Sequence, residues 1–197
     1  MHVSEKAGLS ERDICTKFVT PALTKAGWDL QTQIREQVNI TKGRVVVKGE
    51  KVSRDTPKFA DYILYHTSNI PVAVIEAKDN KHVTGAGMQQ ALAYARLYDV
   101  PFVYSTNGDG FLEHDRTGRS ALVERELQLD EFPGPDELWQ RYRTWKKLNA
   151  EAERIVGQGY YIGDLNKQPR YYQLAAINTT IEAIAKGQNR ILLVMAT

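Results

Sequence analysis

The sequence holds a single cysteine, Cys15, so no disulfide can form within the chain. It has no cluster of histidines and cysteines with the spacing of a zinc site. No apolar run of the signal-peptide kind precedes Gly8, and no later segment is long enough to span a bilayer. We therefore expect a cytoplasmic protein with no disulfide framework, no zinc centre and no membrane partner.

The chain also lacks a large charge of one sign, because 26 basic residues nearly balance 24 acidic ones and leave a formal net charge of +2. So small a charge does not by itself predict nucleic-acid binding, although a local basic patch would suffice for it. The hydrophobic fraction of 42% and the length of 197 residues fit one globular domain and part of another.

Apolar spacing predicts helices and short strands in alternation. A helix capped by Ser10 is expected to run to Gly27, with a kink or early break at Pro21. The other predicted elements are strands over 31–40, 45–47, 59–65, 72–77, 101–105, 110–114, 121–127 and 190–195, and helices over 84–97, 136–154 and 170–186. This order predicts an α/β domain with a mixed sheet flanked by helices over about the first 130 residues.

The most informative segment is the apolar run that ends in Glu76-Ala77-Lys78. Residues two apart share one face of a strand, so Glu76 and Lys78 point the same way, and Asp61 on the preceding strand of a hairpin can reach the same edge. Two carboxylates and a main-chain carbonyl are hard ligands that suit Mg²⁺. A metal-bound water is a better nucleophile at neutral pH, and an ammonium can stabilise the charge that develops on a phosphate.

Two observations bear on this interpretation in opposite directions. Acidic-x-Lys pairs also arise by chance, as in Asp79-Asn80-Lys81, and a solvated pair at a strand end contributes only about 0–1 kcal/mol. On the other side, Gln90 and Tyr94 are four residues apart and share a face of the next helix, from which they can reach the same edge. A surface Gln beside a half-buried Tyr is the alternative for that pair.

Together, Asp61, Glu76-Ala77-Lys78 and the later Gln90-x-x-x-Tyr94 resemble the PD-(D/E)xK nuclease pattern. The Gln-x-x-x-Tyr helix is typical of the branch that holds RecB-like nucleases and the motor subunits of type I restriction enzymes. The resemblance implies that Asp61 and Glu76 bind the metal, that Lys78 is catalytic, and that Gln90 and Tyr94 support the site.

The resemblance extends to Glu11, which matches the acidic residue that often completes the metal site. A Glu in the first turn of a helix is also favoured by the helix dipole, so this assignment has a simpler alternative. The sequence departs from the pattern at Ala60, where many members carry a proline.

Near the other end, Gln168 to Gln173 resembles the adenine-recognising Q motif of superfamily 2 helicases. The resemblance implies that Gln173 reads the adenine of ATP and that Arg170 and Tyr171 frame the base. No G-x-x-x-x-G-K-[ST] loop is present, so this stretch is not expected to hydrolyse ATP alone. The implied organisation is an endonuclease domain over 1–132, a helical linker over 133–167 and the beginning of a helicase domain over 168–197.

Both resemblances point to the R subunit of type I restriction enzymes. They imply Mg²⁺-dependent cleavage of double-stranded DNA within a complex that contains specificity and methyltransferase subunits and translocates DNA with ATP. A basic stretch before Asp61 either tracks the DNA backbone or forms a solvated face; it comprises Lys42, Arg44, Lys48, Lys51, Arg54 and Lys58. The alternatives are a non-catalytic DNA-binding or docking module on a nuclease fold, and a region that merely positions the motor.

Overall fold

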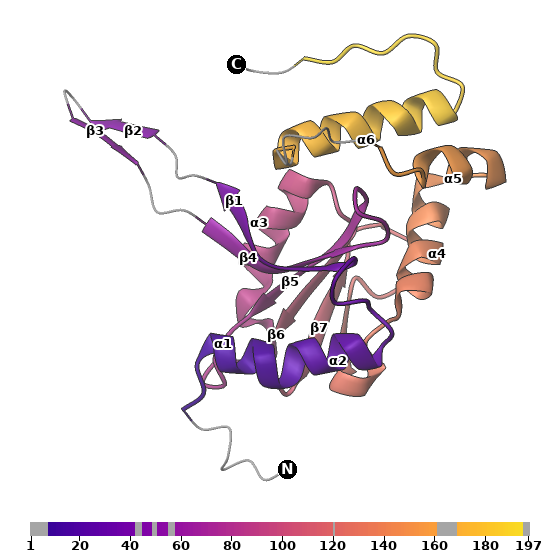
Figure 1. The fold of residues 1–197 in the computed structure, drawn as a ribbon. Helices are drawn as coiled ribbons and strands as arrows, with labels where there is room; N and C mark the ends of the chain where they lie inside the picture. Colours follow the sequence, from indigo (N-terminus) through magenta and orange to yellow (C-terminus); the bar gives the residue numbers. More distant parts are fainter. Residues whose placement is uncertain are drawn as a thin grey trace.

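A mixed six-stranded sheet forms the centre of the molecule (Figure 1). The computed structural model describes residues 8–41, 45–48, 51–54, 58–119, 121–160 and 169–194. The strand order is β1-β4-β5-β6-β7-β8, and of these pairs only β5 and β6 run parallel. The strands are β1 (Ile34–Thr41), β4 (Lys58–Tyr65), β5 (Pro71–Ala77), β6 (Phe102–Thr106), β7 (Gly110–Asp115) and β8 (Glu124–Gln128).

The centre of the sheet is buried on both faces. Every residue of β5 and of β6 is buried, whereas β7 alternates between buried and half-buried positions. Parallel strands need a crossover, which here is the 3₁₀ turn η2 (Thr84–Gly87) followed by helix α3 (Met88–Tyr98). The predicted β4–β5 hairpin, the following helix and the β6–β7 pair are confirmed.

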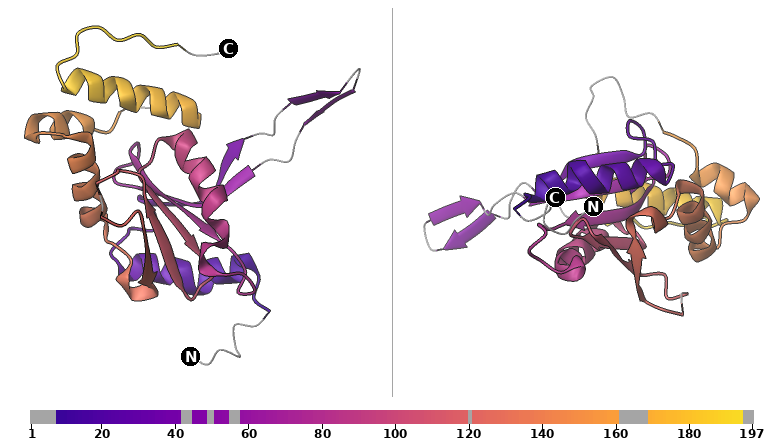
Figure 2. Two further views of the ribbon diagram at one scale, coloured as in Figure 1. Left: turned by 180° about the vertical axis from the view of Figure 1, so that it is seen from behind. Right: turned by 90° about the horizontal axis from the view of Figure 1, so that it is seen from below.

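One helical rod covers one face of the sheet and α3 covers the other (Figure 2). The rod consists of α1 (Glu11–Ile14), the π-helical turn η1 (Cys15–Val19) and α2 (Thr20–Lys25). Ser10 and Asp13 form the expected capping box at its start. The predicted kink at Pro21 is replaced by the wide turn before it, in which the Thr20 N–H bonds to the Cys15 carbonyl and the helix continues.

The sheet separates two hydrophobic clusters. The first lies toward the helical rod and includes Trp28, Tyr62 and Tyr104. The second lies under α3 and includes Ile63 and Met88. Both clusters contain side chains from β4 and β5. The two strands that carry the candidate site residues are therefore held by packing on both faces.

Three further helices follow the sheet: α4 (Pro135–Lys146), α5 (Ala150–Val156) and α6 (Tyr171–Ala185). The prediction of one helix over 136–154 is wrong. Lys147 adopts a left-handed conformation with φ of 53°, and the Asn149 side chain accepts the Ala152 N–H and so begins α5 anew.

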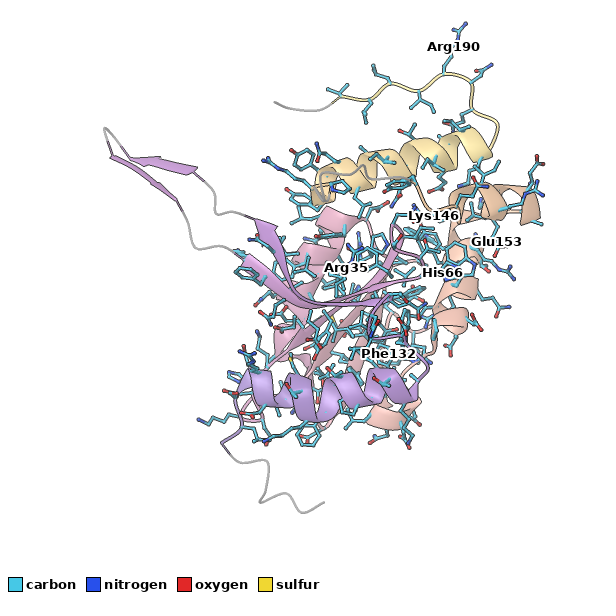
Figure 3. The ribbon with its side chains drawn as sticks, viewed as in Figure 1. Arg35, His66, Phe132, Lys146, Glu153 and Arg190 are labelled. Atoms are coloured by element: carbon cyan, nitrogen blue, oxygen red, sulfur yellow. The ribbon has the colours of Figure 1, made fainter. Side chains whose placement is uncertain are left out.

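Helix α4 packs against the sheet and contributes Leu138 and Trp139 to the first cluster. The His66 ring, from the β4–β5 turn, stacks on Trp139 with the ring centroids 3.9 Å apart, beside α4 (Figure 3). Trp28 donates its indole N–H to the Pro133 carbonyl at 2.9 Å. The segment expected as a linker is therefore in contact with the sheet core, and the division into three domains stays a prediction.

The predicted strand over 190–195 is wrong where the structure describes it. Residues 191–194 form no strand, and Leu192 and Val194 are 88% and 82% exposed. A strand satisfies its backbone groups through a neighbour, and no described strand lies beside this segment. Met195 lies outside the described residues.

A small ribbon projects from the ends of β1 and β4 (Figure 1). It pairs the predicted strand β2 (Val45–Lys48) with β3 (Lys51–Arg54), for which the sequence predicted no strand. The predicted turn at 42–44 lies outside the described residues. Within the described part of the chain, no helix has the length and apolar character required to cross a membrane.

Candidate active site

The candidate site lies where β4 and β5 separate. Tyr62 and Ile75 form the last pair of the two strands at this end. Their neighbours, Asp61 on β4 and Glu76 on β5, lie just beyond that pair. Beyond that point the Asp61 carboxylate accepts the Ala77 N–H through Oδ2 at 2.8 Å. A side chain, and not the main chain of β4, therefore satisfies this amide, and the two acidic residues come to lie at the same edge.

Glu76 is a buried carboxylate with incomplete partners. Its residue is 2% exposed, and Oε1 accepts from Lys78 Nζ at 3.1 Å and from the Gln90 amide. Oε2 is buried and has no hydrogen-bond partner among the described residues. Burial, followed by the charge of Asp61, raises the pKa of Glu76 to about 8.

Lys78 connects the acidic groups. Its Nζ lies 3.1 Å from Glu76 Oε1 and 3.5 Å from Glu11 Oε1. Burial alone lowers the pKa of Lys78, but the surrounding carboxylates, Glu76 foremost, raise it more, so the net shift is upward. The lysine is thus an ammonium at neutral pH, and Glu11 from the helical rod is its second partner.

The next helix contributes the pair expected from its spacing. Gln90 Nε2 donates to Glu76 Oε1 and also to the Tyr94 hydroxyl at 3.0 Å. Tyr94 is buried in the second cluster and so fixes the amide. The structure therefore brings together all six residues that the sequence singled out here, which are Glu11, Asp61, Glu76, Lys78, Gln90 and Tyr94.

Sequence reasoning missed two residues that shape the site. Gln37 on β1 donates from Nε2 to Asp61 Oδ1 at 2.9 Å. Burial raises the pKa of Asp61, and the hydrogen bonds from Ala77 and Gln37 oppose this shift without cancelling it. Gly87 packs directly on Glu76, because a Cβ there would lie 2.9 Å from Glu76 Cγ. The Gly-Ala-Gly run before α3 was a signal for such a close approach.

The donor set fits a hard divalent cation that keeps most of its water. No group of three or more His, Cys, Asp or Glu side chains within the described ranges is arranged to hold a metal. The available protein donors are the carboxylates of Asp61 and Glu76, and Mg²⁺ is commonly bound by one or two carboxylates and several waters. The unpartnered Glu76 Oε2 supports this fit, since a buried acceptor without a donor is costly. Glu11 is directed to Lys78, so its assignment as a metal ligand stays a prediction.

The residues of the expected adenine site lie on α6, at the opposite end of the sheet from α1 (Figure 1). Gln173 accepts the Arg170 N–H at 2.9 Å and so caps its own helix. The Tyr171 ring packs against Tyr98 with the centroids 5.9 Å apart. These contacts are made within the chain and stabilise the start of α6, so the recognition of adenine stays a prediction.

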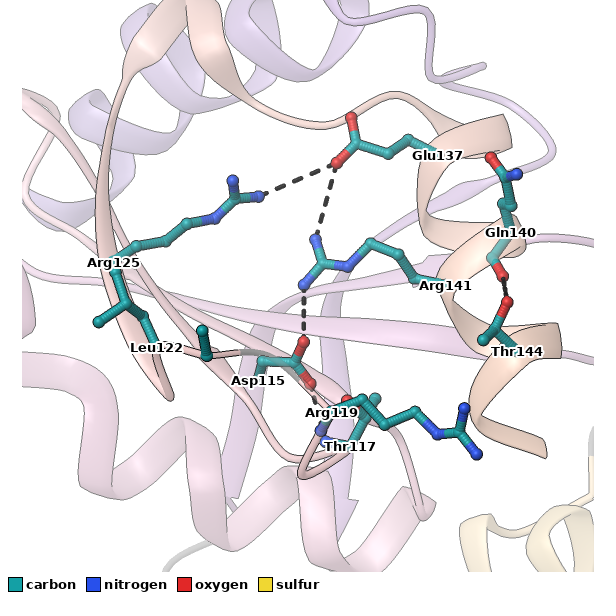
Figure 4. A pocket seen from close by; sticks show the side chains of 10 residues that line it. Asp115, Thr117, Arg119, Leu122, Arg125, Glu137, Gln140, Arg141 and Thr144 are labelled. Atoms are coloured by element: carbon teal, nitrogen blue, oxygen red, sulfur yellow. Dashed lines mark hydrogen bonds and ion pairs between the residues drawn. The ribbon is translucent and has the colours of Figure 1, made fainter. Parts of the chain in front are cut away.

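A further cavity of about 630 Å³ lies between α4 and the end of β7 with its connection to β8 (Figure 4). Arg141 crosses it and pairs with Asp115 at 3.0 Å and with Glu137 at 3.7 Å. Its acidic groups are thus neutralised by arginine, which distinguishes this cavity from the Asp61–Glu76 edge.

A mixed sheet between helices, with two carboxylates and a lysine gathered at one edge, defines an α/β protein with an acidic edge beside a cationic group. No protein-family model matches the chain. The EcoAI type I restriction enzyme endonuclease subunit of Escherichia coli is 53% identical over 97% of this chain and 24% of its own length. The EcoKI endonuclease subunit of Escherichia coli K12 is 25% identical over 99% of this chain and 20% of its own length.

A solved fragment of an HsdR subunit of a type I restriction enzyme from Vibrio vulnificus has the same fold, with a TM-score of 0.82 and 40% identity. The alignment covers 96% of this chain and 35% of that one. Over nearly its whole length the chain is therefore similar to part of the endonuclease (R) subunits of type I restriction enzymes. It spans about a quarter of the length of the curated relatives that it matches.

Proposed function

We propose that this chain is the Mg²⁺-dependent endonuclease region of a type I restriction enzyme subunit, which hydrolyses phosphodiester bonds of double-stranded DNA. The observation that carries the proposal is the buried Glu76, whose Oε2 has no hydrogen-bond partner among the described residues and lies in a site that also contains Asp61 and Lys78. The 53% identity to an endonuclease subunit supports the same activity.

In this mechanism, Asp61 and Glu76 would hold the cation. The chemistry that a divalent cation would supply there is to make water a better nucleophile at neutral pH and to offset the charge of the scissile phosphate. Lys78 donates from its ammonium to the attacking water or to the phosphate oxygen on which negative charge develops. Glu11 fixes the position of Lys78, and Gln90, held by Tyr94, fixes Glu76.

We further propose how the site meets its substrate. In this family a separate subunit reads the DNA sequence, so contacts from this chain go mainly to phosphates. The β2–β3 ribbon projects next to β1 and β4 and belongs to the basic stretch 42–58, which suits it to follow a DNA backbone.

The longer protein supplies the rest of the activity in this proposal. The endonuclease domain over 1–132 connects through 133–167 to a helicase domain that begins at 168 and translocates DNA with ATP. Gln173, Arg170 and Tyr171 there take the adenine. The partners are the specificity and methyltransferase subunits of the restriction complex.

The test is DNA cleavage by the complete restriction complex with Glu76→Gln or Lys78→Ala in this chain. We expect cleavage to fall at least about 10²- to 10³-fold while ATP hydrolysis is retained. The matched control is Lys81→Ala, which removes an exposed lysine three residues from Lys78 and should leave cleavage unchanged. Undiminished cleavage by both site variants would instead favour a non-catalytic docking module.

A further inference from the structure

Strands β1 and β4 change faces halfway along their length. Ile34 packs in the first cluster and Glu36 accepts from Thr20 of the helical rod at 3.1 Å. After Gln37, Ile40 packs in the second cluster, under α3, and Val38 packs against that cluster. Residues an even number apart share a face in a regular strand, so the strand must rotate between Glu36 and Val38.

Gln37 is the residue at which this rotation occurs. Its φ is 49°, which is the left-handed region, and a residue other than glycine there costs about 1–2 kcal/mol. The pairs Glu36–Tyr62 and Val38–Ala60 keep one register, so no residue is inserted and Gln37 stands opposite Asp61. The partner strand changes faces at the same level, since Tyr62 belongs to the first cluster and Ala60 to the second.

The rotation has a chemical consequence at Asp61. Gln37 Nε2 donates to Oδ1 at 2.9 Å, while the Ala77 N–H donates to Oδ2 at 2.8 Å. One donor on each oxygen fixes the rotation of the carboxylate about its Cβ–Cγ bond and leaves each oxygen a further lone pair. Gln37 and Asp61 also line one cavity of about 400 Å³, together with Glu11, so solvent and ions can reach this carboxylate.

We propose that Gln37 is a positioning residue of the metal site, whose strained backbone directs its amide to Asp61 and holds that carboxylate in one orientation for the cation. The proposal rests on the proposed function, because it takes Asp61 as a metal ligand. Strain in a strand persists only where the surroundings over-determine it, and such strain clusters at functional sites. Residues that orient a ligand typically change metal affinity about 10- to 100-fold when they are replaced.

The test separates the backbone of Gln37 from its amide. Gln37→Gly keeps the left-handed conformation and removes the donor, whereas Gln37→Asn keeps an amide on a shorter side chain that tolerates this conformation. Lys147→Gly is the matched control, because exposed Lys147 has a φ of 53° outside the site. The complete subunit without nucleotide is titrated with Mn²⁺ alone, and binding is followed by electron paramagnetic resonance. The signal lost in Glu76→Gln identifies this site.

We expect Gln37→Gly to weaken Mn²⁺ binding at this site about 10- to 100-fold and to move the pH midpoint of binding upward, because ionised Asp61 loses a donor. Gln37→Asn should bind more tightly than Gln37→Gly, and Lys147→Gly should bind like the parent. Both glycine variants should unfold at the same temperature as the parent or above it. A purely structural role of Gln37 predicts none of the changes in binding.

Two results would overturn the proposal. The first is parental Mn²⁺ affinity and pH midpoint in Gln37→Gly, with Glu76→Gln still losing the site; this outcome leaves the proposed function intact. The second is an equal loss of binding in Lys147→Gly, which would trace the effect to backbone changes in general. If neither Glu76→Gln nor Asp61→Asn alters Mn²⁺ binding, the metal site of the proposed function fails as well.

Discussion

Two buried glutamates, Glu76 on β5 and Glu113 on β7, have the same exposure of 2% and opposite surroundings. Glu113 accepts from two arginines, Arg141 and Arg125, and from the Tyr104 hydroxyl. Burial raises the pKa of Glu113, but the two arginines lower it more, so it lies below its ordinary value. The negative charge of Glu113 is therefore fully compensated by these partners, and we call Glu113, Asp115, Arg125 and Arg141 the compensated cluster.

Glu76 is compensated only in part. One lysine and one amide reach Oε1, nothing among the described residues reaches Oε2, and its pKa lies at about 8. Two carboxylates of equal burial thus show that burial alone does not mark a functional group. The distinguishing feature is an acceptor left without a donor, which a cation can satisfy.

Breaking the compensated cluster should have the largest effect on stability. Arg141→Ala leaves Glu113 and Asp115 buried without their main partner, and removal of one member of such a group costs about 3–5 kcal/mol. Urea unfolding followed by circular dichroism measures the change. Arg141→Lys should recover part of the loss, because it restores the charge without the paired N–H groups. A loss below about 1 kcal/mol in Arg141→Ala would contradict this view of Glu113.

The two glutamates should also respond to pH in opposite directions. Glu76 has a folded pKa of about 8 against an ordinary 4.5, so the folded state keeps its proton between these values while the unfolded state loses it. Without divalent cations, its contribution is present below pH 4.5 and is lost as the pH rises to about 8, by at most about 1.4 kcal/mol per unit. Glu76→Gln removes this slope, so the variant should be more stable than the parent at pH 8.

Glu113 provides the control for that measurement. Its folded pKa is lowered, so its contribution is present above pH 4.5 and is lost as the pH falls through the lower folded value. Glu113→Gln should therefore be less stable than the parent at pH 8, where Glu76→Gln is more stable. Equal effects of the two variants at pH 8 would show that the two sites do not differ in compensation.

The parts of the site that the sequence predicted follow from local periodicity. Glu76 and Lys78 lie on one face because strands alternate, and Gln90 and Tyr94 lie on one face because helices repeat every 3.6 residues. Gln37 could not be found in this way. Glutamine has no preference for positive φ, and its conformation is set by two strands that change faces together.

The errors in the predicted fold have the same origin. The apolar composition of 190–195 predicts a strand, but a strand forms only beside a neighbour that satisfies its backbone hydrogen bonds. The helical spacing over 136–154 continues through the break at Lys147, although Asn149 was a visible cap signal. Local patterns therefore predict the element type well and the tertiary breaks poorly.

Gly87→Ala should disturb Glu76 and leave Glu113 untouched. The backbone of Gly87 has a φ of −84°, so alanine is tolerated there, but its Cβ would lie 2.9 Å from Glu76 Cγ and 3.1 Å from Ser105 Oγ. Overpacking of this kind costs about 1–3 kcal/mol. Thermal unfolding should show this loss, and cleavage should fall with it. Gly159→Ala is the control, since nothing lies within 4 Å of its Cβ.

The smallest effect is expected at the solvent end of the compensated cluster. Glu137 is 54% exposed and lies 3.7 Å from Arg141 Nη1 and 3.9 Å from Arg125 Nη2 (Figure 4). Solvent screens such pairs, so Glu137→Gln should change the free energy of unfolding by less than about 1 kcal/mol. A double-mutant cycle with Arg141→Ala should give weak coupling, whereas the cycle between Glu113 and Arg141 should give strong coupling. Equal coupling in both cycles would mean that charge, and not burial with complete hydrogen bonding, stabilises the cluster, and the contrast with Glu76 would then lose its physical basis.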